Sequence, residues 1–249
     1  MIFFDIDGTL IDHASASAAA SLVLYDQFPG EIPFAQEHFP AAWEAILNKH
    51  FTRFCQGEIS IWEQRRERMR EVFARPDFTD AEADSRYQVF IRAYQSLTCA
   101  FADAAPCLEQ LGDQPLGIIS NGAREQQIGK LERAGLRRYF TVMVFSEDVG
   151  FGKPDARIFL EACRRAGEAP SHCVHVGDDV VADIRASHAL GIRPVWVDRL
   201  GLNQEQLPGR RVTSLHELAR ALEPDSGGVE DWEKAKKGRK QDQQDEMNP

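Results

Sequence analysis

The sequence lacks long hydrophobic runs: no apolar stretch in its 249 residues approaches the roughly 18 residues that a membrane-spanning helix needs. The N-terminus opens on Met1-Ile2-Phe3-Phe4 and turns acidic at Asp5, without the basic segment or cleavage site of a secretion signal. We therefore expect no membrane partner and a cytoplasmic location, with the first residues already inside the fold.

Positive charge is scarce. Lys and Arg number 29 against 39 Asp and Glu, which gives a formal net charge of -10 at pH 7. A surface of this sign repels phosphate backbones. Nucleic-acid polymers are therefore poor candidate partners, although a small anionic ligand held at one local site is not excluded.

Cysteine is also sparse. The five residues are scattered and odd in number, and they contain no C-x-x-C pair. Free Cys is among the residues most often buried, and an unpaired set of this kind does not form a disulfide framework. The sequence predicts reduced, mostly buried thiols.

What the chain does have is 43% hydrophobic residues, and they are arranged as strands alternating with helices. Such alternation predicts an α/β fold with a parallel sheet buried between helices, whose ligands lie at the carboxyl ends of the strands. Apolar runs predict strands at 2–5, 115–119, 141–145, 173–177 and 193–197, and helical patterns lie near 103–112, 123–135, 156–167, 180–190 and 214–222.

A long helical stretch interrupts this alternation. Between the first strand and residue 97, apolar and aromatic residues such as Trp43 and Tyr87 recur at helical spacing. We predict an inserted helical subdomain at 14–96, with more than half of the aromatic residues and a small core of its own. The α/β core would then comprise 1–13 and 97–223, and the polar segment 224–249 has too few apolar residues to offset the entropy of ordering, so we expect a disordered tail.

The clearest chemical signal is Asp5-Ile6-Asp7-Gly8-Thr9-Leu10, directly after the first strand. The carboxylates of Asp5 and Asp7 repel each other unless a cation lies between them or one is protonated. Gly8 permits a tight turn near a ligand, and Thr9 offers a hydroxyl group and backbone donors. A solvated acidic turn is the alternative interpretation of this segment alone.

The ends of the other predicted strands carry matching groups, so the alternative of a solvated turn loses most of its weight. A helix start following a small turn presents backbone N–H groups that favour an anion. Taken alone, a turn of this kind or a single Lys is usually ordinary surface structure. The candidates are Ser120, Asn121 and Gly122 after the second strand, Lys153 after the third, and Asp178, Asp179 and Asp183 after the fourth.

In this order, Asp5, Ser120, Lys153 and Asp178 with Asp183 resemble the four motifs of the haloacid-dehalogenase-like (HAD) hydrolase superfamily. The resemblance covers about residues 1–223. The helical insert looks like the type-1 cap of that superfamily. The resemblance implies a Rossmann-like parallel sheet core with an inserted helical cap subdomain that moves over it.

The resemblance also implies roles that the chemistry of the residues supports. Asp5 would attack phosphorus to form an aspartyl-phosphate. Asp7 would protonate the leaving oxygen and then deprotonate the attacking water, with a pKa raised by its acidic neighbours. Mg²⁺ would be held by Asp5, the backbone carbonyl of Asp7 and Asp178. The substrate phosphate would meet Thr9, Ser120, Asn121, Gly122 and the catalytic Lys153, while Asp183 orients Lys153 or a metal-bound water and Asp179 is either a ligand or a support.

The expected function is that of a Mg²⁺-dependent phosphatase acting on a small phosphorylated metabolite, with nucleoside 5′-monophosphates as one candidate class. Alternatives are a sugar-phosphate or phosphoglycolate-type phosphatase, a haloacid dehalogenase, and a non-catalytic phosphate-binding protein. Dehalogenases resemble this site less, because they lack the second aspartate of the first motif and need no metal.

Three segments, 51–60, 131–136 and 146–150, are similar to the branch of the superfamily that contains pyrimidine 5′-nucleotidases and N-acylneuraminate-9-phosphatases. The resemblance places specificity residues near 12–17 and 39–62. Arg65 and Arg66 either meet the substrate or lie along the helix surface. We expect a monomer or a homodimer.

Overall fold

The computed structural model describes residues 1–201 and 207–223, so the predicted tail at 224–249 lies outside the described residues. Its centre is a parallel six-stranded sheet of order β3-β2-β1-β4-β5-β6. The strands are β1 (Ile2–Phe4), β2 (Leu116–Ser120), β3 (Val142–Phe145), β4 (Val174–Gly177), β5 (Arg193–Val197) and β6 (Arg210–Val212).

Helices cover both faces of this sheet because its strands are apolar on both sides. Ile2 and Phe4 of β1 belong to the hydrophobic cluster that includes residues of α5, α6 and α10, whereas Phe3 packs into a second cluster with residues of α8. The helices of this part are α5 (Ala104–Leu111), α6 (Arg124–Arg133), α7 (Ser146–Val149), α8 (Ala156–Ala166), α9 (Ala186–Ala189) and α10 (Leu218–Leu222), with the π-helical turn η3 (Val180–Arg185) and the 3-10 turns η1 (Arg137–Tyr139), η2 (Pro170–His172) and η4 (Leu215–Glu217).

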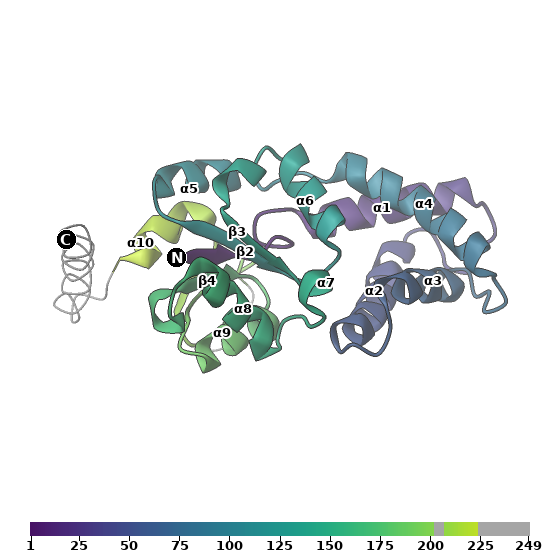
Figure 1. The fold of residues 1–249 in the computed structure, drawn as a ribbon. Helices are drawn as coiled ribbons and strands as arrows, with labels where there is room; N and C mark the ends of the chain where they lie inside the picture. The colour runs from purple at the N-terminus through teal and green to yellow at the C-terminus, as the bar shows by residue number, and fades with distance from the viewer. Residues whose placement is uncertain (202–206, 224–249) are drawn as a thin grey trace, which may run out of the picture.

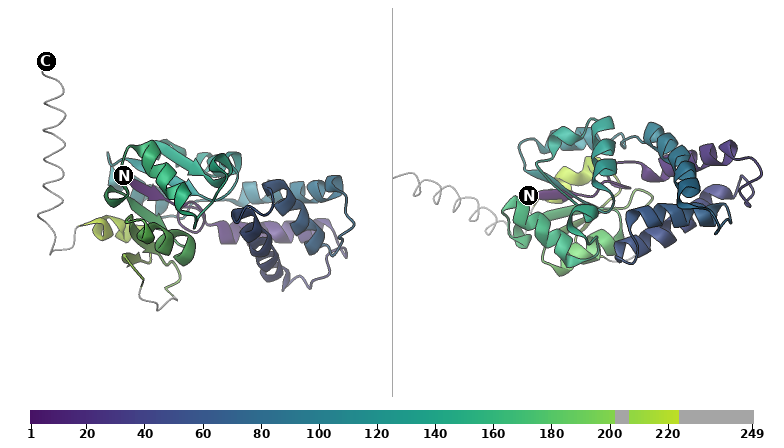
Figure 2. Two further views of the ribbon diagram at one scale, coloured as in Figure 1. Left: turned by 60° about the horizontal axis from the view of Figure 1, so that its bottom comes forward. Right: turned by 45° about the vertical axis from the view of Figure 1, so that its right-hand side comes forward.

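Four helices between β1 and α5 form a separate lobe, which we call the helical lobe: α1 (His13–Gln27), α2 (Phe39–Cys55), α3 (Ile61–Val72) and α4 (Asp80–Leu97). Figures 1 and 2 show the helical lobe beside the sheet, joined to it at both ends of the lobe segment. Its core is a cluster of its own around Trp43, Phe39 and Phe90. Ser60 and Thr79 begin α3 and α4 with complete capping boxes, which satisfy backbone N–H groups at the two helix starts.

The predicted fold class, a Rossmann-like parallel sheet with an inserted set of helices, is confirmed, and all five predicted strands are present. Two differences stand out. The edge strand β6 was not predicted, because Arg210-Arg211-Val212 carries a single apolar residue. The predicted helix at 180–190 winds first as the π-helical turn η3 and then as the short helix α9.

The sheet order determines where a ligand can lie. β1 is central and pairs in parallel with β2 on one side and with β4 on the other. The chain order reverses at this point, and the crevice outside the carboxyl ends of the strands at such a switch point is where open α/β sheets bind ligands. Among the described residues, no helix combines the length and apolar character needed to cross a membrane.

Candidate active site

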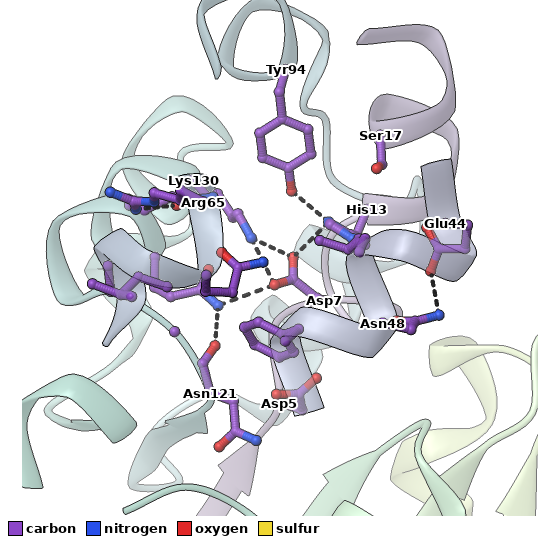
Figure 3. Close-up of a pocket in the computed structure, with 18 of the residues that line it drawn as sticks. Asp5, Asp7, His13, Ser17, Glu44, Asn48, Arg65, Tyr94, Asn121 and Lys130 are labelled. Carbon is purple, nitrogen blue, oxygen red and sulfur yellow. Dashed lines mark hydrogen bonds and ion pairs between the residues drawn. The ribbon is translucent and has the colours of Figure 1, made fainter. Parts of the chain in front are cut away.

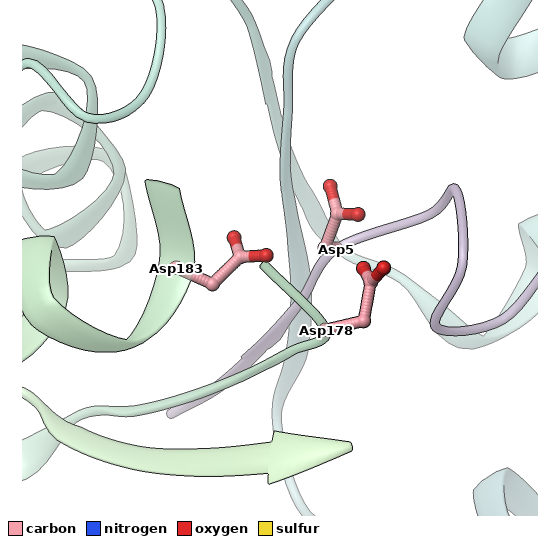
Figure 4. Close-up of side chains that lie close together, drawn as sticks. All are labelled: Asp5, Asp178 and Asp183. Carbon is pink, nitrogen blue, oxygen red and sulfur yellow. The ribbon is translucent and has the colours of Figure 1, made fainter. Parts of the chain in front are cut away.

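The carboxyl ends of β1 and β4 bring three aspartates together (Figure 4). Asp5 follows β1 and donates its backbone N–H to the Val176 carbonyl oxygen over 2.9 Å. Asp5, Asp178 and Asp183 each present one carboxylate oxygen, and these oxygens lie within 4.8 Å of one another. Gly8 has a φ of +80° and packs against Asp178, so that a Cβ atom there would overlap the Asp178 carboxylate. The absence of a side chain at Gly8 therefore allows the first loop to approach the end of β4.

One lysine neutralises part of this cluster. Lys153 is buried, and its Nζ lies 2.6 Å from Asp5 Oδ1 and 2.6 Å from Asp183 Oδ1. Burial alone would lower the pKa of Lys153, but the two carboxylates raise it, so the side chain is an ammonium. Asp183 Oδ1 also lies 2.8 Å from His175 Nε2, and its Oδ2 accepts the backbone N–H of Asp179. Asp183 is thus fully engaged in holding Lys153 and the start of η3.

The positive charge of Lys153 is not enough to keep Asp5 and Asp178 ionised near neutral pH. Burial raises the pKa of Asp5 to about 7, with Lys153 opposing the rise and Asp183 and Asp7 adding to it. Burial and the nearby carboxylates of Asp5 and Asp183 raise the pKa of Asp178 to about 8. Adjacent carboxylate oxygens that resist ionisation are a donor set suited to a hard divalent cation, which would restore their charged form. The residues present therefore fit Mg²⁺.

Asp7 points away from this cluster, towards helix α6 and the helical lobe (Figure 3). Its Oδ1 and Oδ2 lie 2.7 and 2.6 Å from Lys130 Nζ, and its Oδ2 accepts a hydrogen bond of 3.0 Å from Gln127 Nε2. Burial would raise the pKa of Asp7, but Lys130, His13 and Gln127 lower it to about 2. The predicted rise in this pKa is therefore wrong. The sequence did not reveal that a buried ammonium would face Asp7 in place of its acidic neighbours.

The predicted phosphate-binding residues fall into two groups. Asn121 and Gly122 line the cavity above the acidic cluster, and the Asn121 side chain fixes the Lys153 backbone through two hydrogen bonds of 2.7 and 2.8 Å. Ser120 and Thr9 are buried behind the cavity wall. The Ser120 hydroxyl accepts from Gln127 Nε2, and the Thr9 hydroxyl donates to Asp178 Oδ1 over 3.2 Å.

The Gly122 backbone N–H and the Asp179 carboxylate both form hydrogen bonds with other groups of the protein. The Gly122 N–H, which the sequence assigned to the phosphate, donates to Ser146 Oγ over 2.8 Å. Asp179 lines the cavity, but its Oδ1 accepts the N–H groups of Val181 and Ala182 and so caps η3. Asp179 is therefore positioned as a support, one of its two expected roles.

A cavity of about 390 Å³ extends from this cluster into the helical lobe. Both regions in which specificity residues were expected contribute to its wall: His13 and Ser17 from 12–17, and Glu44, Leu47, Asn48, Phe51 and Ile61 from 39–62. Arg65 also lines it and donates to Gln126 Oε1 of α6 over 3.1 Å. Arg66 faces elsewhere, pairing with Asp84. One end of the cavity thus carries the aspartates and the other end belongs to the helical lobe.

Comparison with known proteins identifies the family. The model of haloacid dehalogenase-like hydrolases matches residues 1–191, most of the chain. The chain belongs to this family of hydrolases. The suspected branch is confirmed as well: the hydrolase is 30% identical over 225 residues to the pyrimidine 5′-nucleotidase YjjG of Escherichia coli (strain K12), covering 89% of this chain and 96% of the relative. It is 26% identical over 238 residues to the N-acylneuraminate-9-phosphatase of Rattus norvegicus, covering 89% and 93%.

Solved structures show the same architecture. The crystal structure of the HAD-hydrolase YfnB from Bacillus subtilis, bound to magnesium, superposes with a TM-score of 0.76 at 24% identity and covers 89% of this hydrolase and 97% of that chain. A 2-haloacid dehalogenase from Pseudomonas syringae pv. Tomato DC3000 superposes with a TM-score of 0.67 at 31% identity over 89% and 96%. The fold is therefore shared by family members whose names give different chemistries.

Sequence reasoning missed several residues that build the site of this hydrolase. Lys130 and Gln127 donate hydrogen bonds to the Asp7 carboxylate. The Nδ1 atom of His13 lies 2.7 Å from the Tyr94 hydroxyl oxygen. A signal was available in α6, where Gln127 and Lys130 share the buried face with Leu131. Polar residues on the inward face of an amphipathic helix usually have a partner inside.

Arg199, after β5, is a further residue that was missed. Its guanidinium donates to the carbonyl oxygens of Gly8 over 3.2 Å and Thr9 over 2.6 Å. It also makes two hydrogen bonds, of 3.0 and 3.1 Å, to the Asp103 carboxylate, and it stacks on the Phe101 ring at 3.6 Å. Arg199 thus ties the loop after Asp7 to the segment that returns from the helical lobe.

Proposed function

We propose that this hydrolase is a Mg²⁺-dependent phosphatase that cleaves small phosphate monoesters through an aspartyl-phosphate. The observation that carries the proposal is the cluster of Asp5, Asp178 and Asp183, with one oxygen each within 4.8 Å and with Lys153 bound to two of the three. The pKa values of Asp5 and Asp178 are raised to about 7 and about 8, as expected of a site built to be completed by a cation.

Charge explains why both cations are needed. Two like unit charges 4 Å apart repel by roughly 4 kcal/mol at an effective dielectric constant of 20, so the carboxylates alone would keep a phosphate out. The Lys153 ammonium offsets part of this repulsion and stabilises charge on the phosphoryl oxygens during transfer. Mg²⁺, held by Asp5, the backbone carbonyl of Asp7 and Asp178, would supply the remaining positive charge.

In the first step, a carboxylate oxygen of Asp5 attacks phosphorus and the bond from phosphorus to the ester oxygen breaks, which leaves an aspartyl-phosphate and an alkoxide to be protonated. We assign that proton to Asp7, which must therefore be protonated when the substrate is bound, although Lys130, His13 and Gln127 hold its pKa at about 2 before the substrate binds. In the second step, Asp7 accepts a proton from the water that hydrolyses the aspartyl-phosphate. Lys130 favours the ionised carboxylate of Asp7, which is the form that the second step requires.

The helical lobe would act as the cap that covers this chemistry. Its contacts with the sheet part near the site include two hydrogen bonds: Arg65 of α3 donates to Gln126, and Asn121 donates to Cys55 Sγ of α2 over 3.4 Å. A cover that closes on these contacts excludes water during attack on Asp5 and readmits it for hydrolysis. We assign 14–96 this role, with 1–13 and 97–223 as the catalytic core.

Nucleoside 5′-monophosphates are the substrate class we propose first, because the relative with 30% identity over nearly the whole chain is named a pyrimidine 5′-nucleotidase. A sugar phosphate is the second candidate, supported by the N-acylneuraminate-9-phosphatases. The dehalogenase neighbour at 31% identity makes 2-haloacids a necessary comparison.

The test is turnover of a chromogenic phosphate ester with Mg²⁺, with EDTA, and with 2-chloropropionate as the competing reaction class. We expect hydrolysis of the ester that EDTA abolishes, and no release of chloride. Asp5→Asn should remove essentially all activity while the protein stays folded, and Asp7→Asn should be nearly as damaging. Asp26→Asn, which alters an exposed carboxylate on α1 that does not line the cavity, is the matched control.

Equal turnover in metal-free buffer would refute the metal assignment. Release of chloride from 2-chloropropionate without ester hydrolysis would show that the protein is a dehalogenase and would refute the proposed phosphatase function. Near-normal turnover by Asp7→Asn would remove its acid–base role.

A further inference from the structure

The cavity has a second polar end inside the helical lobe. Gln64 and Arg68 lie one turn apart on α3, are 2% and 3% exposed, and line the same cavity as Asp5. Within residues 1–201 and 207–223, neither Gln64 Nε2 nor Arg68 Nε has a hydrogen-bond partner. A buried donor without a partner costs about 1–3 kcal/mol. Two such donors on one cavity wall indicate that an acceptor arrives with the ligand.

The Arg68 guanidinium is held in place by aromatic rings. It lies 4.8 Å from the centroid of Trp43, 5.3 Å from that of Tyr87 and 5.2 Å from that of Phe90. The Trp43 ring is itself fixed, because its Nε1 donates to Ser17 Oγ over 3.0 Å. Burial lowers the pKa of Arg68, while Tyr87 and Glu44 oppose that shift, and an acceptor placed at the unpartnered Nε would stabilise the guanidinium further. The donors are therefore oriented before a ligand binds.

The charges around these donors favour an acceptor as the ligand group. Arg65 adds a second guanidinium to this end of the cavity, stacked on Trp62 and Tyr87 at 4.9 and 5.0 Å. The carboxylate on the same part of the wall is Glu44, and it already accepts from Asn48 Nδ2 over 3.1 Å. This end thus offers mainly N–H donors, whereas the sheet end offers the carboxylates and lysines that handle the phosphate.

We propose that Gln64 and Arg68 form a subsite for a planar carbonyl-type acceptor on the leaving group, at the end of the substrate opposite the phosphate. This inference rests on the proposed phosphatase function and deepens it. The shared chemistry is a C=O oxygen between two N–H donors, and the oxygen can belong to a pyrimidine base or to a carboxylate. Substrates that lack such a group leave both donors buried and unpaired, and so react less efficiently.

The experiment compares kcat/KM for three esters in Mg²⁺ buffer: uridine 5′-monophosphate, 3-phosphoglycerate and ribose 5-phosphate, which has neither a base nor a carboxylate. Gln64→Met keeps the length of the side chain and removes the amide, and Arg68→Met removes the guanidinium. Arg66→Met is the matched control on the same helix, since Arg66 pairs with Asp84 and Asp80 outside the cavity. Binding of uridine alone, measured by calorimetry, is a second readout that needs no turnover.

We expect the preference for a carbonyl-bearing ester over ribose 5-phosphate to fall about tenfold or more in Gln64→Met and in Arg68→Met, and to be unchanged in Arg66→Met. A fall for uridine 5′-monophosphate, with weaker uridine binding, assigns the acceptor to a base. A fall for 3-phosphoglycerate assigns it to a carboxylate.

An unchanged preference for both esters in Gln64→Met would overturn the subsite, even if Arg68→Met failed to fold. Failure of all three esters and of a chromogenic ester to react would overturn the proposed function instead, and uridine binding would still test the subsite.

Discussion

Replacing Arg199 with methionine should destabilise the fold and slow the reaction together. The change keeps a long apolar side chain that can still pack on Phe101, but it removes the guanidinium that binds the Gly8 and Thr9 carbonyls and the Asp103 carboxylate. Asp103 would keep its hydrogen bonds from the Ser214 hydroxyl and the Leu215 N–H, at 2.7 and 2.8 Å, but would lose its cation.

The expected loss of stability follows from the burial of the Arg199–Asp103 ion pair. The side chains of Arg199 and Asp103 are 18% and 8% exposed, and removing one partner of a buried ion pair typically costs about 3–5 kcal/mol. For a chain of this size, each kcal/mol shifts Tm by about 2–4 °C, so a fall on the order of 10 °C is expected. Arg211→Met is the control, because Arg211 pairs with Asp198 but is 38% exposed, and a partly exposed pair contributes about 1 kcal/mol or less.

The measurement is thermal unfolding followed by circular dichroism between pH 3 and pH 7, with turnover measured in parallel. Burial raises the pKa of Asp103, but Arg199, Ser214 and Leu215 N–H lower it below its ordinary value. The stabilisation by this carboxylate is therefore present above about pH 4, the unfolded-state pKa, and is lost as pH falls through the lower folded pKa. The difference between wild type and Arg199→Met should shrink with it. A difference that grew towards pH 3, or losses equal to those of Arg211→Met, would refute the reasoning.

Three further predictions concern the site. Asp178→Asn should raise the Tm of the metal-free protein while abolishing Mg²⁺-dependent turnover, because the pKa of Asp178 is raised to about 8 and its charge is costly without a cation; a lower Tm would contradict this. Lys130→Met should move the acid limb of the pH–kcat profile to higher pH, because it removes the cation that lowers the pKa of Asp7 to about 2; an unmoved limb would separate Lys130 from the proton transfer. Adding Mg²⁺ and a phosphate mimic should slow hydrogen exchange in peptides 39–62 and 97–102, and unchanged exchange at saturation would mean that the helical lobe is a fixed wall.

Most of the sheet could be predicted because its information is local. A strand buried on both faces reads as a short apolar run, and β1, β2, β4 and β5 all do so. β6 could not be found in this way: Arg210 and Arg211 precede its single buried residue, Val212, and its place follows from pairing with β5. Pairing partners distant in sequence leave no local pattern.

The residues of the site likewise divide into those with a local sequence signal and those whose partners lie far away in the sequence. Asp5, Lys153 and Asp178 could be grouped because each follows a recognisable strand, and parallel strands end at one edge of the sheet. The partners of Asp7 could not, because Lys130 comes from a helix more than a hundred residues later and a lysine in a helix is ordinarily solvated. The direction of the pKa shift of Asp7 depended on that one contact.

The strand that precedes Asp5, β1, is also the first strand of the sheet in chain order. β1 pairs with residues 116–118 and 174–176, so at about 5–20 residues per second it waits on the order of ten seconds or more before both neighbours exist. The helical lobe, a continuous segment with its own core, can collapse during that interval, while Ile2, Phe3 and Phe4 have nothing permanent to pack against. Exposed apolar segments of this kind bind chaperones and aggregate. The yield of folded protein should therefore fall when synthesis of the middle third of the chain is slowed, or when residues 2–4 are sterically blocked.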